Sequence, residues 1–207
     1  MVTYEQQLAD HLDFALSEGG MHFDEKSAVH QTLREITRRL DQLAIPYAVV
    51  GGMALFVHGF RRFTEDVDLL VTRQSMDKVL KELDGLGYIQ PAGTSTKLRD
   101  TRTGVQVEFL IAGFYPGDGK PKPVAFPDPL NHVVEISGLK VLGLPSLAEL
   151  KLASGISAPH RLKDLADVQE LIRILKLPRE FAEKLNPYVK DKFLELWTAV
   201  QNAPKSE

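Results

Sequence analysis

Two aspartates separated by one residue lie inside an apolar run, where carboxylates are uncommon. Asp66 and Asp68 flank Val67, and residues 69–71 are all apolar. On a β-strand, residues i and i+2 point to the same face, so the two carboxylates would lie side by side. Like charges at this spacing repel each other unless a cation lies between them. Because hard divalent cations prefer oxygen ligands, we expect Mg²⁺, or Mn²⁺ in its place, as the cofactor.

A third acid interrupts a second strand-like run. Glu108 lies within residues 105–111, which are otherwise apolar except for Gln106. If this strand pairs with the strand that carries the aspartates, Asp66, Asp68 and Glu108 converge on one patch. Two-metal phosphoryl transfer uses such a set of carboxylates to hold its ions. We therefore expect these three acids to be catalytic residues and metal ligands, although a single acid on a strand is often only its exposed face.

Two adjacent glycines precede the aspartates. Gly51 and Gly52 follow an apolar run at 47–50 and come before an amphipathic segment at 53–60. A strand that stops at glycine and leads into a helix can bring backbone N–H groups close to a phosphate. The pair alone is typical of a tight strand-to-helix connection, but the Asp-x-Asp that follows favours a triphosphate site. Arg62 lies between the two motifs, where it could meet phosphate oxygens or pair with an acid.

Together these motifs resemble the minimal nucleotidyltransferases of the DNA polymerase beta superfamily, and within it the AbiEii-type branch known from toxin–antitoxin loci. The resemblance covers roughly residues 45 to 175. It rests on the segments 50–55, 58–62, 66–68 and 161–167. Many members carry Gly-Ser at the position of Gly51-Gly52 and Asp at the position of Glu108. The resemblance implies an α/β (α+β) fold with a mixed β-sheet core, flanked by N- and C-terminal helices.

The same resemblance implies a role for basic residues downstream. In the family, helices that correspond to this region cover the nucleotide. Lys151 and Lys163 would then contact phosphate, and Asp164 would position a base or ribose. Together with Gly51, Gly52 and Arg62, they form the expected nucleotide-binding set. Taken alone, residues 161–167 are equally typical of a charged helix face.

The implied reaction transfers a nucleoside monophosphate from a nucleoside triphosphate to a hydroxyl acceptor. A tRNA end, a protein hydroxyl and a small molecule such as an aminoglycoside all stay open as acceptors. Toxin-type members favour the first two, and an antitoxin partner stays open as well. The alternative function is a non-catalytic nucleotide- or partner-binding module that keeps the fold without the chemistry.

Composition narrows the class of protein. The chain has 207 residues, 43% hydrophobic and 26% charged, as in ordinary globular proteins. A net charge of -3 argues against a protein that coats nucleic acid, although a local basic groove could bind one. The absence of cysteine excludes disulfides, thiolate zinc sites and cysteine catalysis. No apolar stretch reaches membrane-spanning length, and the first residues do not resemble a signal peptide, so we expect a cytoplasmic protein without a membrane partner.

The elements that position these residues follow from periodicity and from Gly and Pro. We expect three parts: an N-terminal helical extension over 1–44, a core over 45–145 and a C-terminal helical region over 146–207. Gly19 and Gly20 are expected to separate the first two helices, and Ser75 to cap a later one. The expected helices span 3–18, 25–43, 53–60, 76–86, 147–154, 159–175 and 178 to about 201. The expected strands span 47–50, 66–71, 96–100 and 105–111, and two short strands lie within 133–144. The strands 96–100 and 105–111 are expected to form a hairpin. A loop over 113–131 is expected to connect this hairpin to the two short strands.

Overall fold

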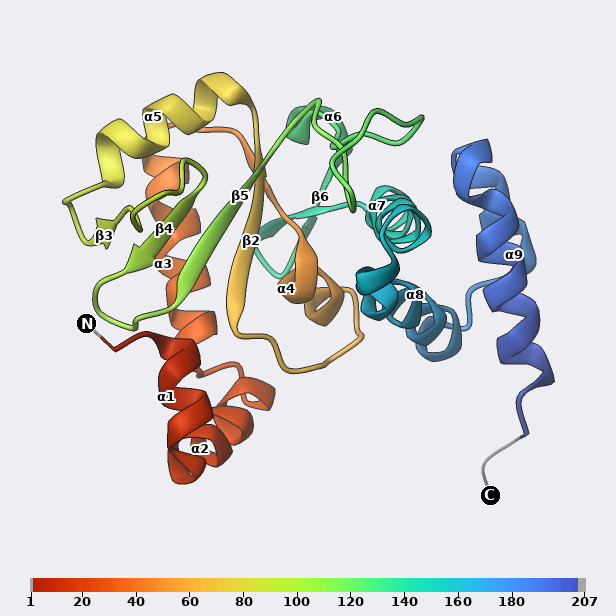
Figure 1. Cartoon of the computed structure of the whole chain (residues 1–207), viewed down its shortest axis with the longest axis horizontal. Coiled ribbons are helices and arrows are strands. Elements are labelled where there is room, and N and C mark those ends of the chain that lie inside the picture. Colours follow the sequence, from red (N-terminus) through yellow and green to blue (C-terminus); the bar gives the residue numbers. More distant parts are fainter. Residues whose placement is uncertain (1, 205–207) are drawn as a thin grey trace.

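A mixed β-sheet forms the middle of the molecule, with helices around it (Figure 1). The computed structural model describes residues 2–204, and within them the sheet has seven strands in the order β3-β4-β5-β2-β1-β7-β6. The strands are β1 Tyr47–Val49, β2 Asp66–Val71, β3 Tyr88–Ile89, β4 Lys97–Asp100, β5 Gln106–Ile111, β6 Val133–Ile136 and β7 Leu139–Leu142. The expected mixed sheet flanked by helices is confirmed.

The strand that carries the two aspartates lies near the centre of the sheet. β2 pairs in parallel with β5 and antiparallel with β1, while β4 and β5 form the expected antiparallel hairpin. A central strand is covered on both faces, which explains why Val67, Leu69, Leu70 and Val71 are all buried. The acids of β2 therefore interrupt a strand that is otherwise part of the core.

The helices are α1 Tyr4–Asp10, α2 Leu12–Phe23, α3 Ala28–Gln42, α4 Gly51–Val57, α5 Arg73–Leu83, α6 Pro129–His132, α7 Leu144–Ser157, α8 Leu162–Leu175 and α9 Pro187–Asn202. Two 3₁₀ segments, Pro159–Arg161 and Arg179–Lys184, precede α8 and α9. In Figure 1, α7, α8 and α9 form a group at one end of the molecule, and α1, α2, α3 and α5 lie toward the other end. The short helix α4 lies between these groups.

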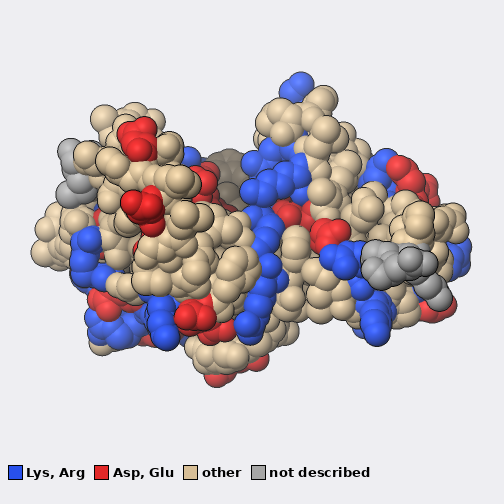
Figure 2. Space-filling view, turned by 90° about the horizontal axis from the view of Figure 1, so that it is seen from below, with Lys and Arg blue, Asp and Glu red and all other residues tan. Residues whose placement is uncertain are grey.

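Charge is distributed unevenly over the surface. On the face seen in Figure 2, Lys and Arg side chains gather in a band across the middle, and acids are scattered around it. Since the net charge of the chain is -3, this band reflects local clustering rather than a general excess of basic residues.

The expectation that Gly19 and Gly20 separate two helices is wrong. α2 continues through both glycines to Phe23. The buried Glu18 ties this helix down, since its carboxylate accepts hydrogen bonds from the Tyr4 hydroxyl at 2.8 Å and from the Ala28 N–H at 2.9 Å. These tertiary contacts outweigh the low helix propensity of glycine, which costs about 1 kcal/mol per residue.

The expected starts of three later helices are also wrong. α5 begins at Arg73 rather than Met76, because the Thr72 hydroxyl, not Ser75, caps it by accepting from the Ser75 N–H at 3.1 Å. α4 begins directly at Gly51, and α7 begins at Leu144, before Pro145 rather than after it. Proline is well tolerated in the first turn, where its missing N–H has no intrahelical partner.

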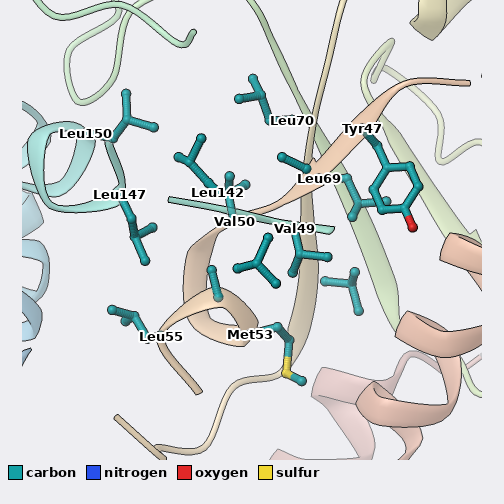
Figure 3. Close-up of a cluster of buried hydrophobic side chains, with 14 of the residues drawn as sticks. Tyr47, Val49, Val50, Met53, Leu55, Leu69, Leu70, Leu142, Leu147 and Leu150 are labelled. Carbon is teal, nitrogen blue, oxygen red and sulfur yellow. The ribbon is translucent and has the colours of Figure 1, made fainter. Parts of the chain in front are cut away.

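One hydrophobic core joins the N-terminal helices, the sheet and the C-terminal helices. The α3 residues Val29, Leu33, Ile36 and Leu40 belong to the same cluster as the strands and as Leu147 of α7. Figure 3 shows side chains from β1, β2, α4 and α7 pointing toward one another. The division of the chain at residues 44 and 145 stays a prediction. Among residues 2–204, no helix combines the length and apolar character needed to cross a bilayer.

We expect Ile36→Ala in α3 to lower the free energy of unfolding by about 2–5 kcal/mol, because Ile36 is fully buried and its truncation leaves a cavity. The exposed Gln42→Ala on the same helix should change it by less than about 0.5 kcal/mol. Urea unfolding of both variants measures the difference. Equal, small losses would mean that α3 is not part of the core.

Candidate functional site

The three acids singled out above line one cavity. Asp68 and Glu108 are directly opposite each other in the parallel β2–β5 pair, and Asp66 lies on the same face as Asp68. All three border a cavity of about 530 Å³, which also contacts Gly51 and Gly52. The structure therefore brings together the acids and the glycines that are far apart in the sequence.

The carboxylates are close enough to influence one another. Burial first, and then the charges of Asp66 and Glu108, raise the pKa of Asp68 to about 7, while Lys151 and Arg161 act in the opposite direction. A carboxylate in this position is stabilised as an anion by any added positive charge. The site is therefore short of positive charge next to Asp68.

Two of the acids already have partners. The Thr64 hydroxyl donates to Asp66 Oδ1 at 2.9 Å, and Lys97 Nζ lies 3.1 Å from Glu108 Oε2. Over residues 2–204, no three His, Asp or Glu side chains form a ready metal-binding group. Asp66, Asp68 and Glu108 thus share a cavity without standing as a preformed three-ligand site. Thr64 and Lys97, which orient the acids, were not expected from the sequence.

Both glycines are required by the side chains that pack against them. Gly51 has φ +60°, and a Cβ built on it would lie 1.8 Å from Asp68 Oδ2. A Cβ on Gly52 would lie 2.5 Å from the Thr64 hydroxyl oxygen. The Val50 N–H also donates to the Asp68 carbonyl at 3.0 Å, so the turn is held against β2. Sequence reasoning assigned the glycines to phosphate binding and missed this packing against Asp68.

A buried ion network forms the opposite wall of the cavity. Lys151 Nζ of α7 donates to Asp164 Oδ1 at 3.0 Å and to Asp167 Oδ2 at 2.7 Å, both on α8. Arg62 makes a bidentate pair with Asp167, at 2.9 and 3.1 Å. Three of the expected nucleotide ligands, Arg62, Lys151 and Asp164, are therefore bound within the protein. Asp167, which completes the network, was not among the expected site residues, although its i+3 spacing from Asp164 on a helix was the available signal.

Hydrogen bonds keep Asp164 ionised. Burial works against its charged form, but Lys151, the Ser154 hydroxyl at 2.7 Å and Arg161 outweigh burial and lower the pKa of Asp164. Lys163 differs, since it is exposed, borders the same cavity, and has no hydrogen-bond or salt-bridge partner among the described residues. It is the expected phosphate ligand that the fold leaves available.

The long loop closes another side of the cavity, and it ends at residue 128 rather than at 131, because helix α6 begins at Pro129. Tyr115, Gly117 and Phe126 border the cavity. The Phe126 N–H donates to the Phe114 carbonyl at 2.8 Å, and a Cβ on Gly117 would lie 2.3 Å from the Ser157 hydroxyl oxygen of α7. The loop is therefore packed against the helical wall and contributes two aromatic residues to the lining of the cavity that the acids border.

No protein-family model and no curated protein matches the sequence. Similar solved structures include an antigenic nucleotidyltransferase-like protein from Paracoccidioides brasiliensis, 18% identical, with 85% of this chain and 93% of that chain covered and a TM-score of 0.47. JHP933 from Helicobacter pylori is 15% identical, with coverages of 83% and 90% and a TM-score of 0.44. The antibiotic-resistance factor ANT(2'')-Ia is 13% identical, with coverages of 81% and 88% and a TM-score of 0.42. At these values the similarity concerns the overall layout and assigns no role to any residue.

We expect Gly51→Ala to destabilise the protein more than Gly85→Ala. Both glycines have positive φ, +60° and +76°, so alanine costs about 1–2 kcal/mol at either position. Only the Cβ at position 51 meets Asp68, whereas nothing lies within 4 Å of a Cβ at position 85. The extra loss in free energy of unfolding should be about 1–3 kcal/mol, measured by urea unfolding. Equal losses would show that β2 yields easily to the added methyl group.

The two lysines should respond differently to truncation. Lys151→Ala leaves the buried Asp164 and Asp167 without their shared cation, so it should cost about 3–5 kcal/mol of unfolding free energy. Lys163→Ala, on the exposed face of the next helix, should cost less than about 0.5 kcal/mol. Thermal and urea unfolding distinguish the two, and a stable Lys151→Ala protein would argue against a structural role for the network.

Proposed function

We propose that this protein is a nucleotidyltransferase, dependent on Mg²⁺ or Mn²⁺, that transfers a nucleoside monophosphate from a nucleoside triphosphate to a hydroxyl acceptor. The observation that carries the proposal is the position of Asp66, Asp68 and Glu108 on two adjacent parallel strands, facing one cavity of about 530 Å³. The glycine turn packed against Asp68 supports it, because it leaves backbone without side chains beside the acids.

Asp66 and Asp68 would hold the cation, and Glu108 would join them once Lys97 releases it. The fit rests on the position of the three carboxylates at one cavity. Burial first, and then the charges of Asp66 and Glu108, raise the pKa of Asp68 to about 7, and a divalent cation would favour its ionised form. When bound, the cation would neutralise charge on the phosphates. Glu108 would hold the cation with one carboxylate oxygen and accept the proton of the acceptor hydroxyl with the other.

The phosphates would lie over Gly51 and Gly52, where no side chain intervenes, with Lys163 as the first basic contact. Arg62 and Lys151 also border this cavity, but both are already engaged with carboxylates, so a phosphate would share them with Asp167 and Asp164. Both residues hold the helical wall against the core. Asp164 would contact a base or ribose beside its present partners Lys151 and Arg161.

In the proposed reaction, the acceptor oxygen attacks the α-phosphorus in line with the leaving group. The new phosphoester bond forms as the bond to the bridging oxygen breaks, and pyrophosphate leaves. The contribution of the protein is chiefly positioning and charge compensation. Tyr115 and Phe126 border the cavity and are placed to contact the acceptor.

The class of acceptor is a proposal that no contact in the cavity decides. A tRNA end, a protein hydroxyl and an aminoglycoside-like small molecule are the candidates; ANT(2'')-Ia, one of the similar structures, is known in complex with adenylyl-2''-tobramycin. Membership of the AbiEii-type branch, action as a toxin, an antitoxin partner and a cytoplasmic location stay predictions from the sequence.

A non-catalytic binding module is the second candidate, and one observation favours it. Glu108 is paired with Lys97, and Arg62 is paired with Asp167. Lys151 is bound to Asp164 and Asp167, so much of the expected site is internally satisfied. Such a module would bind nucleotide, or a partner, without releasing pyrophosphate.

We expect Asp66→Asn and Asp68→Asn each to reduce transfer by at least about a hundredfold, because each removes a carboxylate that the cation needs. The assay incubates the protein with Mg²⁺, each ribonucleoside triphosphate labelled at the α-phosphate, and total tRNA, cell protein or an aminoglycoside. The exposed Asp191→Asn serves as the matched control. Activity retained in either site variant refutes the assignment, and nucleotide binding by the wild type without pyrophosphate release favours the binding module.

A further inference from the structure

A second cavity lies on another side of α4. Its volume is about 470 Å³, and it is enclosed by α3, α4, the segment after α4 and the turn between β6 and β7. Gly51 and Gly52 of α4 border the first cavity, whereas Met53, Phe56 and Val57 of the same helix border the second. None of the acids of the candidate active site borders it, so the two cavities are chemically separate.

Arginines dominate the polar lining of this second cavity. Arg34 and Arg38 come from α3, and Arg61 comes from the segment after α4. Arg38 is neutralised by Glu35 at 2.6 Å, but Arg34 has no salt-bridge partner within residues 2–204, and its guanidinium donates only to the Glu25 carbonyl. Arg61 has one long contact to the Glu25 carboxylate, 3.4 Å, and lies over an aromatic ring. Of these two guanidinium groups, only that of Arg61 contacts a carboxylate, and the contact is long.

The remaining acid of the lining does not change this balance. Asp41 is already paired with Lys140 at 2.5 Å and accepts from the Tyr47 hydroxyl at 3.2 Å. The cavity therefore carries excess positive charge in a chain whose net charge is -3. A guanidinium forms bidentate hydrogen bonds to carboxylate and phosphate groups, so an anion is the complementary occupant.

The hydrogen bonds of two buried histidines, His22 and His30, show which of their ring nitrogens carry protons. His22 Nε2 lies 3.1 Å from the Arg62 carbonyl, which can only accept, so Nε2 carries the proton and Nδ1 is an acceptor. Ser27 Oγ lies 3.3 Å from His22 Nδ1 and 3.0 Å from His30 Nδ1. One arrangement satisfies every contact: Ser27 donates its single proton to His22, and His30 Nδ1–H donates to Ser27.

His30 Nε2 is then an unprotonated acceptor. It is buried and has no hydrogen-bond partner among the described residues, and His30 borders the second cavity. Burial first, and then His22 and Arg34, lower the pKa of His30 to about 4, so the ring stays neutral near pH 7. A buried acceptor without a partner is costly and rare in folded proteins. Because Nε2 is covered in this structure, a donor from an occupant of the cavity would reach it when the imidazole ring turns toward the cavity.

We propose that this second cavity binds a small organic anion. Its carboxylate or phosphate is held by Arg34 and Arg61, its apolar body packs against Leu33 and Phe56 at the base of the cavity, and an O–H or N–H group of the anion donates to His30. The site does not depend on nucleotidyl transfer, because no residue of the candidate active site borders it.

Four probes test the proposal by calorimetric titration of the full chain without nucleotide: inorganic phosphate, benzoate, p-hydroxybenzoate and phenyl phosphate. Inorganic phosphate offers charge alone, benzoate adds a ring, and p-hydroxybenzoate adds a donor. We expect p-hydroxybenzoate to bind more tightly than benzoate, and both more tightly than inorganic phosphate. The affinity of phenyl phosphate compared with that of benzoate decides whether the site prefers phosphate or carboxylate.

Substitutions test whether the arginines of this cavity, rather than arginines elsewhere on the surface, bind the anion. Arg34→Gln and Arg61→Gln should each weaken p-hydroxybenzoate binding by about tenfold or more, since each removes a charge-assisted hydrogen-bond donor. Arg173→Gln, on the exposed side of α8, should leave it unchanged. Failure of every organic probe to exceed inorganic phosphate, or wild-type affinity in both cavity variants, overturns the proposal.

His30→Phe tests the acceptor, because it keeps an aromatic ring of similar size and removes Nε2. It should bring p-hydroxybenzoate down to the affinity of benzoate, and a retained preference would overturn the role of His30. Circular dichroism verifies that the variant is folded. In the wild type, ¹⁵N spectra should show His30 as the Nδ1–H tautomer, with an Nε2 resonance that moves when p-hydroxybenzoate is added. An Nε2–H tautomer, or an unmoved resonance, would likewise overturn it.

Discussion

The close fit of Gly51 against Asp68 is the constraint on which the candidate active site depends. A side chain at position 51 would overlap the Asp68 carboxylate, and position 52 is equally closed by Thr64. The turn after β1 can therefore approach β2 only because both residues are glycine. This approach holds a strand-to-helix connection, a buried strand and its carboxylates in one rigid unit, and every other wall of the cavity is built around it.

The helical wall is joined to that unit by buried charge. Arg62 lies in the segment between α4 and β2, and its side chain pairs with Asp167 of α8. Lys151 of α7 binds both Asp167 and Asp164. Buried ion pairs are poor sources of net stability but are strict about geometry, since a misplaced partner leaves an uncompensated charge. We infer that the network fixes where α7 and α8 lie relative to the acids. A phosphate in the cavity would share Arg62 and Lys151 with these partners.

The N-terminal helices support the segment that carries Arg62. His22 of α2 donates to the Arg62 carbonyl, and Thr32 of α3 donates to Asp100 at the turn end of the β4–β5 hairpin. The N-terminal helices thus hold the segment that precedes β2 and the hairpin that contains β5. The adjacent residues Arg61 and Arg62 border different cavities. One short segment therefore contributes both to the wall of the candidate active site and to the proposed anion site.

The sequence by itself determined the bounds of β2 and the shared face of Asp66 and Asp68, because strand periodicity and apolar runs are local signals. It also indicated that Glu108 would join them if the two strands paired. The mixed sheet flanked by helices was implied by the resemblance of the sequence motifs to a known family. Only the tertiary structure decided the parallel register that sets Asp68 opposite Glu108, the pairing of Lys97 with Glu108, and the internal engagement of Arg62, Lys151 and Asp164. These partners come from residues up to 105 positions apart in the chain, and helix limits such as those of α2 depend on similar contacts. Local propensity carries no information about which distant charge will neutralise a buried one.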